Sequence, residues 1–232
     1  MEEKAKISKT YDIVTKYIKD KIIDGTLKIG DRLPSEREMA EKLGVSRTSI
    51  REAIRALEVI GIIESRRGAG TYIVDNFNNS LFQPLSMMFM LQEYSALDIL
   101  ELREGLEIQC CKMASKVISK KDIEVLNNIV SDMYETTNED KSLDLDIKFH
   151  NVIIKASNNP LIINVLSVIS QLMDKFIKDA RKIILCKNDN REKLLDTHKD
   201  IVLAIESRDE SKCVYSIKKH FELIKESYIA IS

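Results

Sequence analysis

The stretch from Leu33 to Val74 constrains the fold of this chain more than any other part of it. Ser35 is followed three residues later by Glu38, which is the pattern of a capping box at the start of a helix. Gly44 can take the left-handed backbone conformation that ends a helix, and Ser46 is a good N-cap for another one. The stretch therefore predicts two short helices that are joined by a tight turn.

The second of these helices carries two neighbouring stripes. Its apolar residues recur with the 3.6-residue period of a helix, and they are Ile50, Ala53, Ile54, Leu57 and Ile60. Arginines recur every four residues and form a basic stripe beside the apolar one, at Arg47, Arg51 and Arg55. Thr48 and Ser49 add hydroxyls to the first turn. Arginine can hold guanine edges or phosphates and hydroxyls can reach either, so this helix suits the major groove of DNA.

Two short apolar segments follow, separated by a basic loop. Residues 62–63 and 72–74 are expected to form strands, and residues 66–70, Arg-Arg-Gly-Ala-Gly, are expected to form the loop. A flexible basic tip can approach phosphates or a minor groove. A charged face alone would also fit an ordinary solvated helical hairpin. The order of caps, turn, basic stripe and basic hairpin is what favours DNA binding.

Residues 8–75 resemble the winged helix-turn-helix domain of the GntR superfamily of bacterial repressors. The matching words are Gly25-Thr-Leu-Lys-Ile-Gly30, Leu33-Pro-Ser-Glu-Arg37, Gly44-Val-Ser-Arg47, Arg51-Glu-Ala53 and Gly68-Ala-Gly-Thr71. In that family, arginines at three of these positions, the hydroxyls beside them and a glycine of the wing contact operator DNA. The resemblance implies that role for Arg37, Arg47, Thr48, Ser49, Arg51 and Gly68.

Length and composition indicate two mostly helical domains. The 232 residues are enough for a winged helix-turn-helix domain over residues 1–75, a polar linker over 76–80 and a larger domain over 81–232. Only 7 Gly and 3 Pro argue for few turns. The expected fold class is mostly α, an N-terminal winged helix-turn-helix followed by an all-α bundle. The net charge is -1, so the argument for DNA binding depends on where the arginines lie.

The sequence also indicates a compartment. The N-terminus, Met-Glu-Glu-Lys, is too charged for a signal peptide. No stretch approaches the ~20 apolar residues of a membrane-spanning helix. The 4 cysteines lack the spacing of a zinc finger or a redox motif, which fits a reducing environment. We therefore expect a cytoplasmic protein.

Helical periods continue through the rest of the chain. Residues 1–7 are expected to be frayed and residues 8–24 to form the first helix. Asn158-Asn159-Pro160 should interrupt the helical pattern, with the proline at a helix start. The helices expected after the winged motif are 80–91, 95–118, 121–137, 140–157, 160–184, 190–207 and 209–229.

The chain has 3 histidines, and each lies in phase with the apolar stripe of a different predicted helix, at His150, His198 and His220. Asp146 precedes His150 by four residues, so the two side chains share one helical face. A buried carboxylate is costly unless it is paired or bound to a cation, and imidazole is a common ligand of zinc and nickel. One such histidine alone would fit a hydrogen-bonded core residue better. The set of four favours a divalent metal site, although periodicity does not show that the helices meet.

Residues 80–229 resemble the FCD ligand-binding domain of the FadR-type branch of the GntR superfamily. Its pattern is matched in order by Asp146-Ile-Lys-Phe-His150, Ala156-Ser-Asn-Asn-Pro160, His198 and His220. In metal-binding members these positions hold Zn²⁺ or a similar ion, which helps to bind a small carboxylate effector. The resemblance implies zinc here, with nickel or another first-row ion as the alternative. Cys110-Cys111 stands where small aliphatic residues are common, which leaves the effector open.

Arg103 falls inside an apolar stripe of the predicted helix 95–118. It could snorkel or pair with Glu104 or Glu107. It could instead clamp an anionic effector, because a guanidinium matches the geometry of a carboxylate. FCD domains often carry an arginine here for that purpose. Arg181, in a later predicted helix, is a weaker candidate.

These features together predict a homodimeric transcription regulator that acts as a repressor. Two copies of the helix over residues 46–60 would enter successive major grooves of a palindromic operator. A small organic acid bound beside the metal would weaken the DNA complex. One alternative is a regulator for which the metal itself is the signal. The other is a metal-dependent hydrolase, against which the chain lacks a His-Glu-x-x-His motif, so we do not expect an enzyme.

Overall fold

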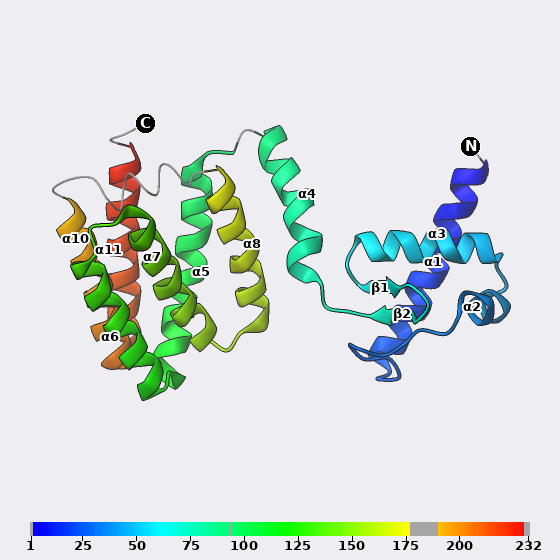
Figure 1. Ribbon diagram of the computed structural model, residues 1–232, viewed down its shortest axis with the longest axis horizontal. Helices are drawn as coiled ribbons and strands as arrows, with labels where there is room; N and C mark the ends of the chain where they lie inside the picture. The colour runs from blue at the N-terminus through cyan, green and yellow to red at the C-terminus, as the bar shows by residue number, and fades with distance from the viewer. Residues whose placement is uncertain (1, 93, 177–189, 230–232) are drawn as a thin grey trace. The chain divides into compact units, whose positions relative to one another are not determined.

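The computed structural model describes residues 2–92, 94–176 and 190–229 (Figure 1). The chain divides into two compact units, Met1–Leu85 and Ser86–Ser232. Each unit encloses its own buried apolar residues, so each is described by itself below.

The first unit is a three-helix domain with a two-stranded hairpin. Its elements are α1 (Glu2–Ile23), α2 (Glu36–Leu43), α3 (Arg47–Val59), β1 (Ile63–Arg66) and β2 (Gly70–Ile73). Helix α1 begins at Glu2, ahead of residue 8 where the sequence predicts its start, and the expected fraying of residues 1–7 remains a prediction. The predicted helix from residue 8 is the continuation of the same α1.

The local signals of the helix-turn-helix act as the sequence predicts. The hydroxyl of Ser35 accepts the backbone N–H of Glu38 at 3.2 Å, and the Glu38 carboxylate accepts the N–H of Ser35 at 2.7 Å, which closes the capping box. Gly44 ends α2 with a φ of 67°. Ser46 then caps α3 by accepting the N–H of Ser49 at 3.1 Å.

The apolar stripe of α3 packs on α1 and forms the core of this unit. Ile50, Ala53, Ile54 and Leu57 are buried as predicted, whereas Ile60 is 45% exposed. Ile60 is the C-cap of α3, one residue beyond the last helical residue, Val59. The other core residues are Val14, Ile18, Leu33, Met39, Ala40, Ile63 and Ile73.

The hairpin is a short antiparallel wing. Ile63 pairs with Ile73 and Arg66 pairs with Gly70, so the strands extend into the predicted loop and leave residues 67–69 as the turn. Arg32 forms an isolated bridge to Tyr72 and fastens the preceding segment to the wing. Gly70 has a φ of 111°, which favours glycine, and a Cβ there would lie 2.5 Å from the flexible Arg32 side chain, which would have to move.

The remaining elements are helices. Their bounds are α4 (Phe77–Gln92), α5 (Ala96–Val117), α6 (Lys120–Glu135), α7 (Glu139–Ala156), α8 (Pro160–Phe176), α10 (Asn190–Glu206) and α11 (Glu210–Ile229). Helix α4 begins at Phe77, inside the segment 76–80 that was predicted as a linker. The predicted helix 160–184 is described as far as Phe176. Arg181 lies outside the described residues.

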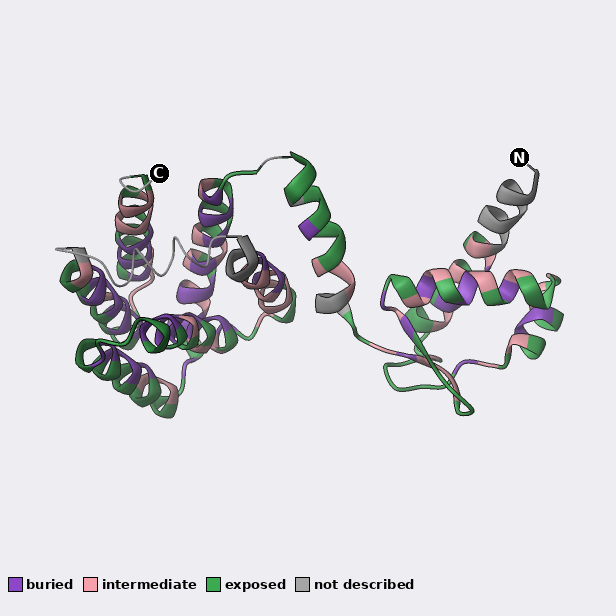
Figure 2. Cartoon of the chain, turned by 45° about the horizontal axis from the view of Figure 1, so that its top comes forward, coloured by how far each residue is buried: buried purple, intermediate pink, exposed green. Residues whose placement is uncertain are grey.

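The second unit is a bundle around α5. Helix α11 packs along α5, with α7 and α8 also against it, and α10 packs on α11 and α6 (Figure 1). Figure 2 shows buried residues along much of α5 and on one side of the helices around it. The largest fully buried side chains in this unit include Phe149, Ile153, Ile201, Ile205 and Phe221. Among the described residues, no helix combines the length and apolar character that a membrane crossing requires.

Two glycines allow a matched test of the helix-turn-helix. Gly44→Ala should destabilise the protein by about 1 kcal/mol, because only glycine adopts a positive φ without a steric cost. Gly105→Ala, inside α5, should stabilise it by up to about 1 kcal/mol, because alanine favours a helix interior. Neither new Cβ meets an atom within 4 Å. Urea unfolding followed by circular dichroism measures both, and shifts of the same sign would contradict the assignment of Gly44.

Candidate nucleic-acid interface and metal centre

The basic stripe of α3 lies on the surface of the first unit. Arg47, Thr48, Arg51 and Arg55 are exposed, beside the buried apolar stripe. The hydroxyl of Ser49 lies 2.8 Å from that of Ser46 and takes part in the helix cap. Arg37 and Gly68, the other residues implied in DNA binding, are exposed as well. The structure thus places all six residues of the predicted DNA-binding set on this unit, and their role remains a prediction.

Arg51 is held in place by a neighbour that the sequence does not reveal. Its Nη2 lies 3.0 Å from Oε2 of Glu36 and its Nε lies 3.3 Å from both carboxylate oxygens. The hydrogen bond from Arg51 to Glu36, with the attraction between their charges, raises the pKa of the guanidinium. Glu36 belongs to the first turn of α2, so this pair fastens α2 to α3 on the face that carries the arginines.

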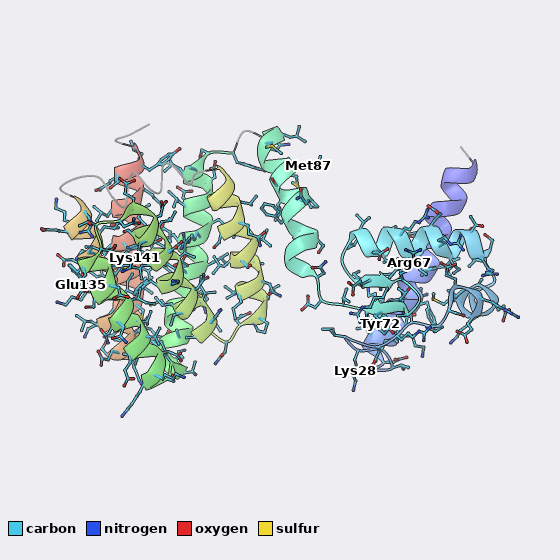
Figure 3. The ribbon with its side chains drawn as sticks, viewed as in Figure 1. Lys28, Arg67, Tyr72, Met87, Glu135 and Lys141 are labelled. Atoms are coloured by element: carbon cyan, nitrogen blue, oxygen red, sulfur yellow. The ribbon has the colours of Figure 1, made fainter. Side chains whose placement is uncertain are left out.

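A hollow of about 410 Å³ separates the start of α2 from the wing. Arg32, Arg66 and Arg67 line it together with Gly68, so the hollow is rich in positive charge. The guanidinium of Arg66 stacks at 4.6 Å over the ring of Tyr72, and Tyr72 is labelled on the wing in Figure 3. The sequence indicated a basic wing tip but not Arg32, because only the bridge to Tyr72 brings that residue to the wing.

The second unit brings the predicted metal ligands together. Asp146 and His150 come from α7, His198 from α10 and His220 from α11, and all four side chains are buried. One donor atom from each residue lies within 4.8 Å of the others. The three helices therefore meet, which periodicity alone did not show.

The ring of His198 is oriented by the backbone of its own helix. Its Nδ1 lies 3.0 Å from the carbonyl oxygen of Leu194. A carbonyl can only accept, so Nδ1 carries a hydrogen and Nε2 is the nitrogen that faces the cluster. That Nε2 lies 3.1 Å from Oδ1 of Asp146. Either a proton or a metal ion between these two atoms would satisfy both.

The ring of His220 is oriented in the same sense by a hydroxyl. Thr197 Oγ1 donates to the carbonyl of Leu194 at 2.6 Å, so it must accept the hydrogen on Nδ1 of His220 at 2.8 Å. His220 Nε2 is then a bare acceptor. It is buried and has no hydrogen-bond partner among the described residues. A buried nitrogen with an unsatisfied lone pair next to a carboxylate has the environment of a metal ligand.

The third ring, His150, is oriented by a carboxylate. Its Nδ1 contacts Oε2 of Glu107, and its Nε2 lies 3.6 Å from Oδ1 of Asp146. Burial would raise the pKa of Glu107, but the charges of Arg103 and His150 outweigh it and lower that pKa to about 2, so Glu107 is an acceptor. All three rings thus turn Nδ1 outward and Nε2 toward Asp146, an arrangement that fits a divalent metal ion.

The buried surroundings of the cluster shift the pKa values of two of its histidines. Burial lowers the pKa of His220 well below its usual value, and the neighbouring imidazoles lower it further. Burial also disfavours a charge on His150, but the carboxylates of Glu107 and Asp146 outweigh it and raise its pKa. The pKa values of these two imidazoles therefore shift in opposite directions within the same buried cluster.

Arg103 pairs with Glu107, one of the two arrangements that the sequence left open. Its Nε contacts Oε1 of Glu107 inside the bundle, and its guanidinium carbon lies 5.8 Å from the ring centre of Phe221. Glu104 instead binds Lys225 at 2.6 Å. The second contact of Glu107, to His150, was not predicted. Whether Arg103 also binds an effector remains a prediction.

A basic helix-turn-helix with a wing, followed by a helical unit with a buried cluster of one aspartate and three histidines, is the architecture of a transcription regulator. Residues 10–73 match the family described as bacterial regulatory proteins, gntR family, and residues 98–223 match the FCD domain. The chain therefore belongs to the GntR family of regulators and carries an FCD domain. FCD domains are associated with metal binding, and this cluster could hold an ion. The chain is a regulator rather than an enzyme.

Similar proteins support this assignment. The regulator LutR of Bacillus subtilis is 28% identical, over 88% of this chain and 94% of its own. The Glc operon transcriptional activator of Escherichia coli is 32% identical, over 70% of this chain and 66% of its own. A solved structure of a GntR protein from Streptococcus agalactiae is 26% identical and covers 95% of this chain and 99% of its own, with a TM-score of 0.62.

The arginines of α3 make a direct test of the nucleic-acid interface. Arg47→Ala or Arg51→Ala should weaken operator binding by more than about tenfold, because each removes a charged contact to a base or phosphate. Gel shifts with a DNA site selected by the wild-type protein from a random library measure this.

Arg55→Ala is the matched control. It lies one turn further along the same stripe, beyond the N-terminal part of a recognition helix that reads bases, so its loss should stay below about threefold. Equal affinity for the wild type and the Arg51→Ala variant would reject α3 as the recognition helix.

Proposed function

We propose that this chain is a homodimeric repressor whose operator affinity falls when a small carboxylate binds beside a divalent metal ion in its FCD domain. The observation that carries the metal site is the convergence of three imidazole Nε2 atoms and Asp146 Oδ1 in a buried cluster. Each Nδ1 has its own hydrogen-bond acceptor, so the three rings are already in the orientation and tautomer of ligands.

In this proposal α3 reads the operator. Its exposed basic stripe would enter the major groove, with Arg47, Thr48 and Arg51 near the bases. Gly68 and the arginines around the wing hollow would lie against the backbone, where positive charge favours binding of any sequence. Ser49 would combine a DNA contact with its place in the cap, and Arg37 would add a contact from α2.

Helix α4 supports the homodimer. Its 16 residues contain no charged side chain, and Met87, Met90 and Leu91 are more than half exposed (Figure 3). Contiguous exposed apolar residues mark surfaces that bind another protein. A second copy of the chain is the partner that also explains DNA reading, because a two-fold dimer matches a palindromic operator.

The proposed metal is zinc, with nickel or another first-row ion as the alternative. Imidazole and carboxylate ligands suit these ions, and the open coordination position that such sites often keep would accept a carboxylate oxygen. Arg103, buried on α5 and joined to the cluster through Glu107, would add a positive charge for the same carboxylate. The ion would supply a Lewis-acidic binding position, and Arg103 would supply hydrogen-bond donors.

The metal is tested by mass spectrometry on protein that is purified without a chelator or a histidine tag. We expect about one divalent ion per chain. Asp146→Asn should lose it, because the variant removes the carboxylate that the described cluster contributes. Asp144→Asn is the matched control on the same helix, since Asp144 is exposed. Wild-type protein that takes up no ion from added zinc or nickel would contradict the metal site.

The regulatory step is tested in a closed binding cycle. Once an organic-acid screen by thermal shift has found an effector, it should weaken operator binding by a coupling of ~1–3 kcal/mol. The operator must then weaken effector binding by the same factor. Unequal factors would contradict direct coupling. An ion that shifts operator affinity with no organic acid present would instead make the metal the signal.

The direction of regulation is tested in a reporter strain. If the protein is a repressor, deletion of its gene should raise expression from the target promoter. The similar Glc operon protein is named as an activator. Lower expression after deletion would therefore reverse the proposed sign while keeping the DNA site.

A further inference from the structure

Glu107 occupies a position between the two proposed ligand-binding groups. It lies on α5, 1% exposed, and each of its carboxylate oxygens has a different partner. Oε1 contacts Nε of Arg103, and Oε2 contacts Nδ1 of His150. The cation proposed for the effector and a ligand proposed for the metal therefore share one carboxylate.

The contact with His150 differs from those of the other two rings. Nδ1 of His198 and of His220 donate to uncharged acceptors, the Leu194 carbonyl and the Thr197 hydroxyl. His150 alone donates to a charged group. A carboxylate behind a ligating histidine fixes its tautomer and makes the ring more basic, so it strengthens the bond to a metal.

The contact between Glu107 and Arg103 affects the balance of charge around the proposed ion. Among the described residues, the buried acidic and basic side chains of this unit are Arg103, Glu107, Asp146 and the three histidines. The Glu107 carboxylate lies between the Arg103 guanidinium and the ring of His150, and Asp146 is the carboxylate within the cluster. Loss of the Glu107 charge would remove a negative charge from between the guanidinium and the ion, and the repulsion between these two cations would grow where the dielectric is low.

We propose that Glu107 is a positioning residue that orients His150 toward the metal and offsets positive charge on Arg103, so that one carboxylate serves both groups. This inference rests on the proposed metal site and assigns a residue outside its ligand set. Glutamine at position 107 would replace one of the two acceptor oxygens with an NH2 group, and this donor would face a donor of either Arg103 or His150.

The test titrates cobalt(II) into metal-free protein, because the visible absorption of cobalt responds to its ligands. Glu107→Gln should weaken cobalt affinity by about 10–100-fold and alter the spectrum. Glu104→Gln is the matched control, since Glu104 lies on the same helix but binds Lys225 at 2.6 Å, and it should bind cobalt as the wild type does. Circular dichroism of each metal-free variant reports its fold.

Two further variants test the charge balance and remain informative if Glu107→Gln fails to fold. Arg103→Met keeps Glu107 on His150 and removes a buried positive charge, so it should bind cobalt more tightly than the wild type. The double variant Arg103→Met, Glu107→Gln should bind it more tightly than Glu107→Gln alone. Weaker binding by Arg103→Met would overturn the link to Arg103.

The outcomes separate this inference from the proposed function. A wild-type protein that binds no cobalt would contradict the metal site itself. A wild-type protein that binds cobalt, with unchanged affinity and spectrum in Glu107→Gln, would overturn only the role of Glu107. Loss of affinity in both Glu107→Gln and Glu104→Gln would show a general effect on α5 and would also overturn it.

Discussion

The second unit depends on one electrostatic constraint, which is that acceptor atoms converge inside an apolar bundle. Asp146 and the Nε2 atoms of three histidines face one another without solvent, and such a set is unstable unless positive charge lies among them. The bundle gathers the ligands from α7, α10 and α11, while α5 supplies Glu107 behind one of them. The helices that pack in the bundle therefore also carry the charged groups of the site, and an ion there would hold three helices together.

Much of the fold follows from local signals in the sequence. The caps at Ser35 and Ser46 and the glycine at Gly44 act over three or four residues, so they can be read without knowing the tertiary structure. Errors occur where a local signal is overruled. Residues 77–80 look like a polar turn but begin α4, and Ile60 continues the apolar stripe but lies beyond the end of α3.

The four residues of the candidate metal site could be predicted from the sequence, but the residues that contact them could not. The phase of each histidine in its own helix indicates burial, and a resemblance supplied the expectation that the helices meet. Glu107 could not be found in this way, because its contact with His150 spans 43 residues and depends on the register between α5 and α7. For Arg103 the sequence left pairing and anion binding open, and only the packing of α5 shows the pairing with Glu107.

The ion pair between Arg51 and Glu36 has a consequence for how the protein would choose its DNA. The guanidinium already has a carboxylate partner in the free protein, so a DNA contact at Arg51 exchanges one partner for another. A base that hydrogen-bonds to the guanidinium compensates for the exchange. A base that does not match the guanidinium gives no compensation, and Glu36 is then left close to the DNA without its partner. The pair therefore lowers affinity for every site but lowers it most for wrong sites, so it favours discrimination over strength of binding.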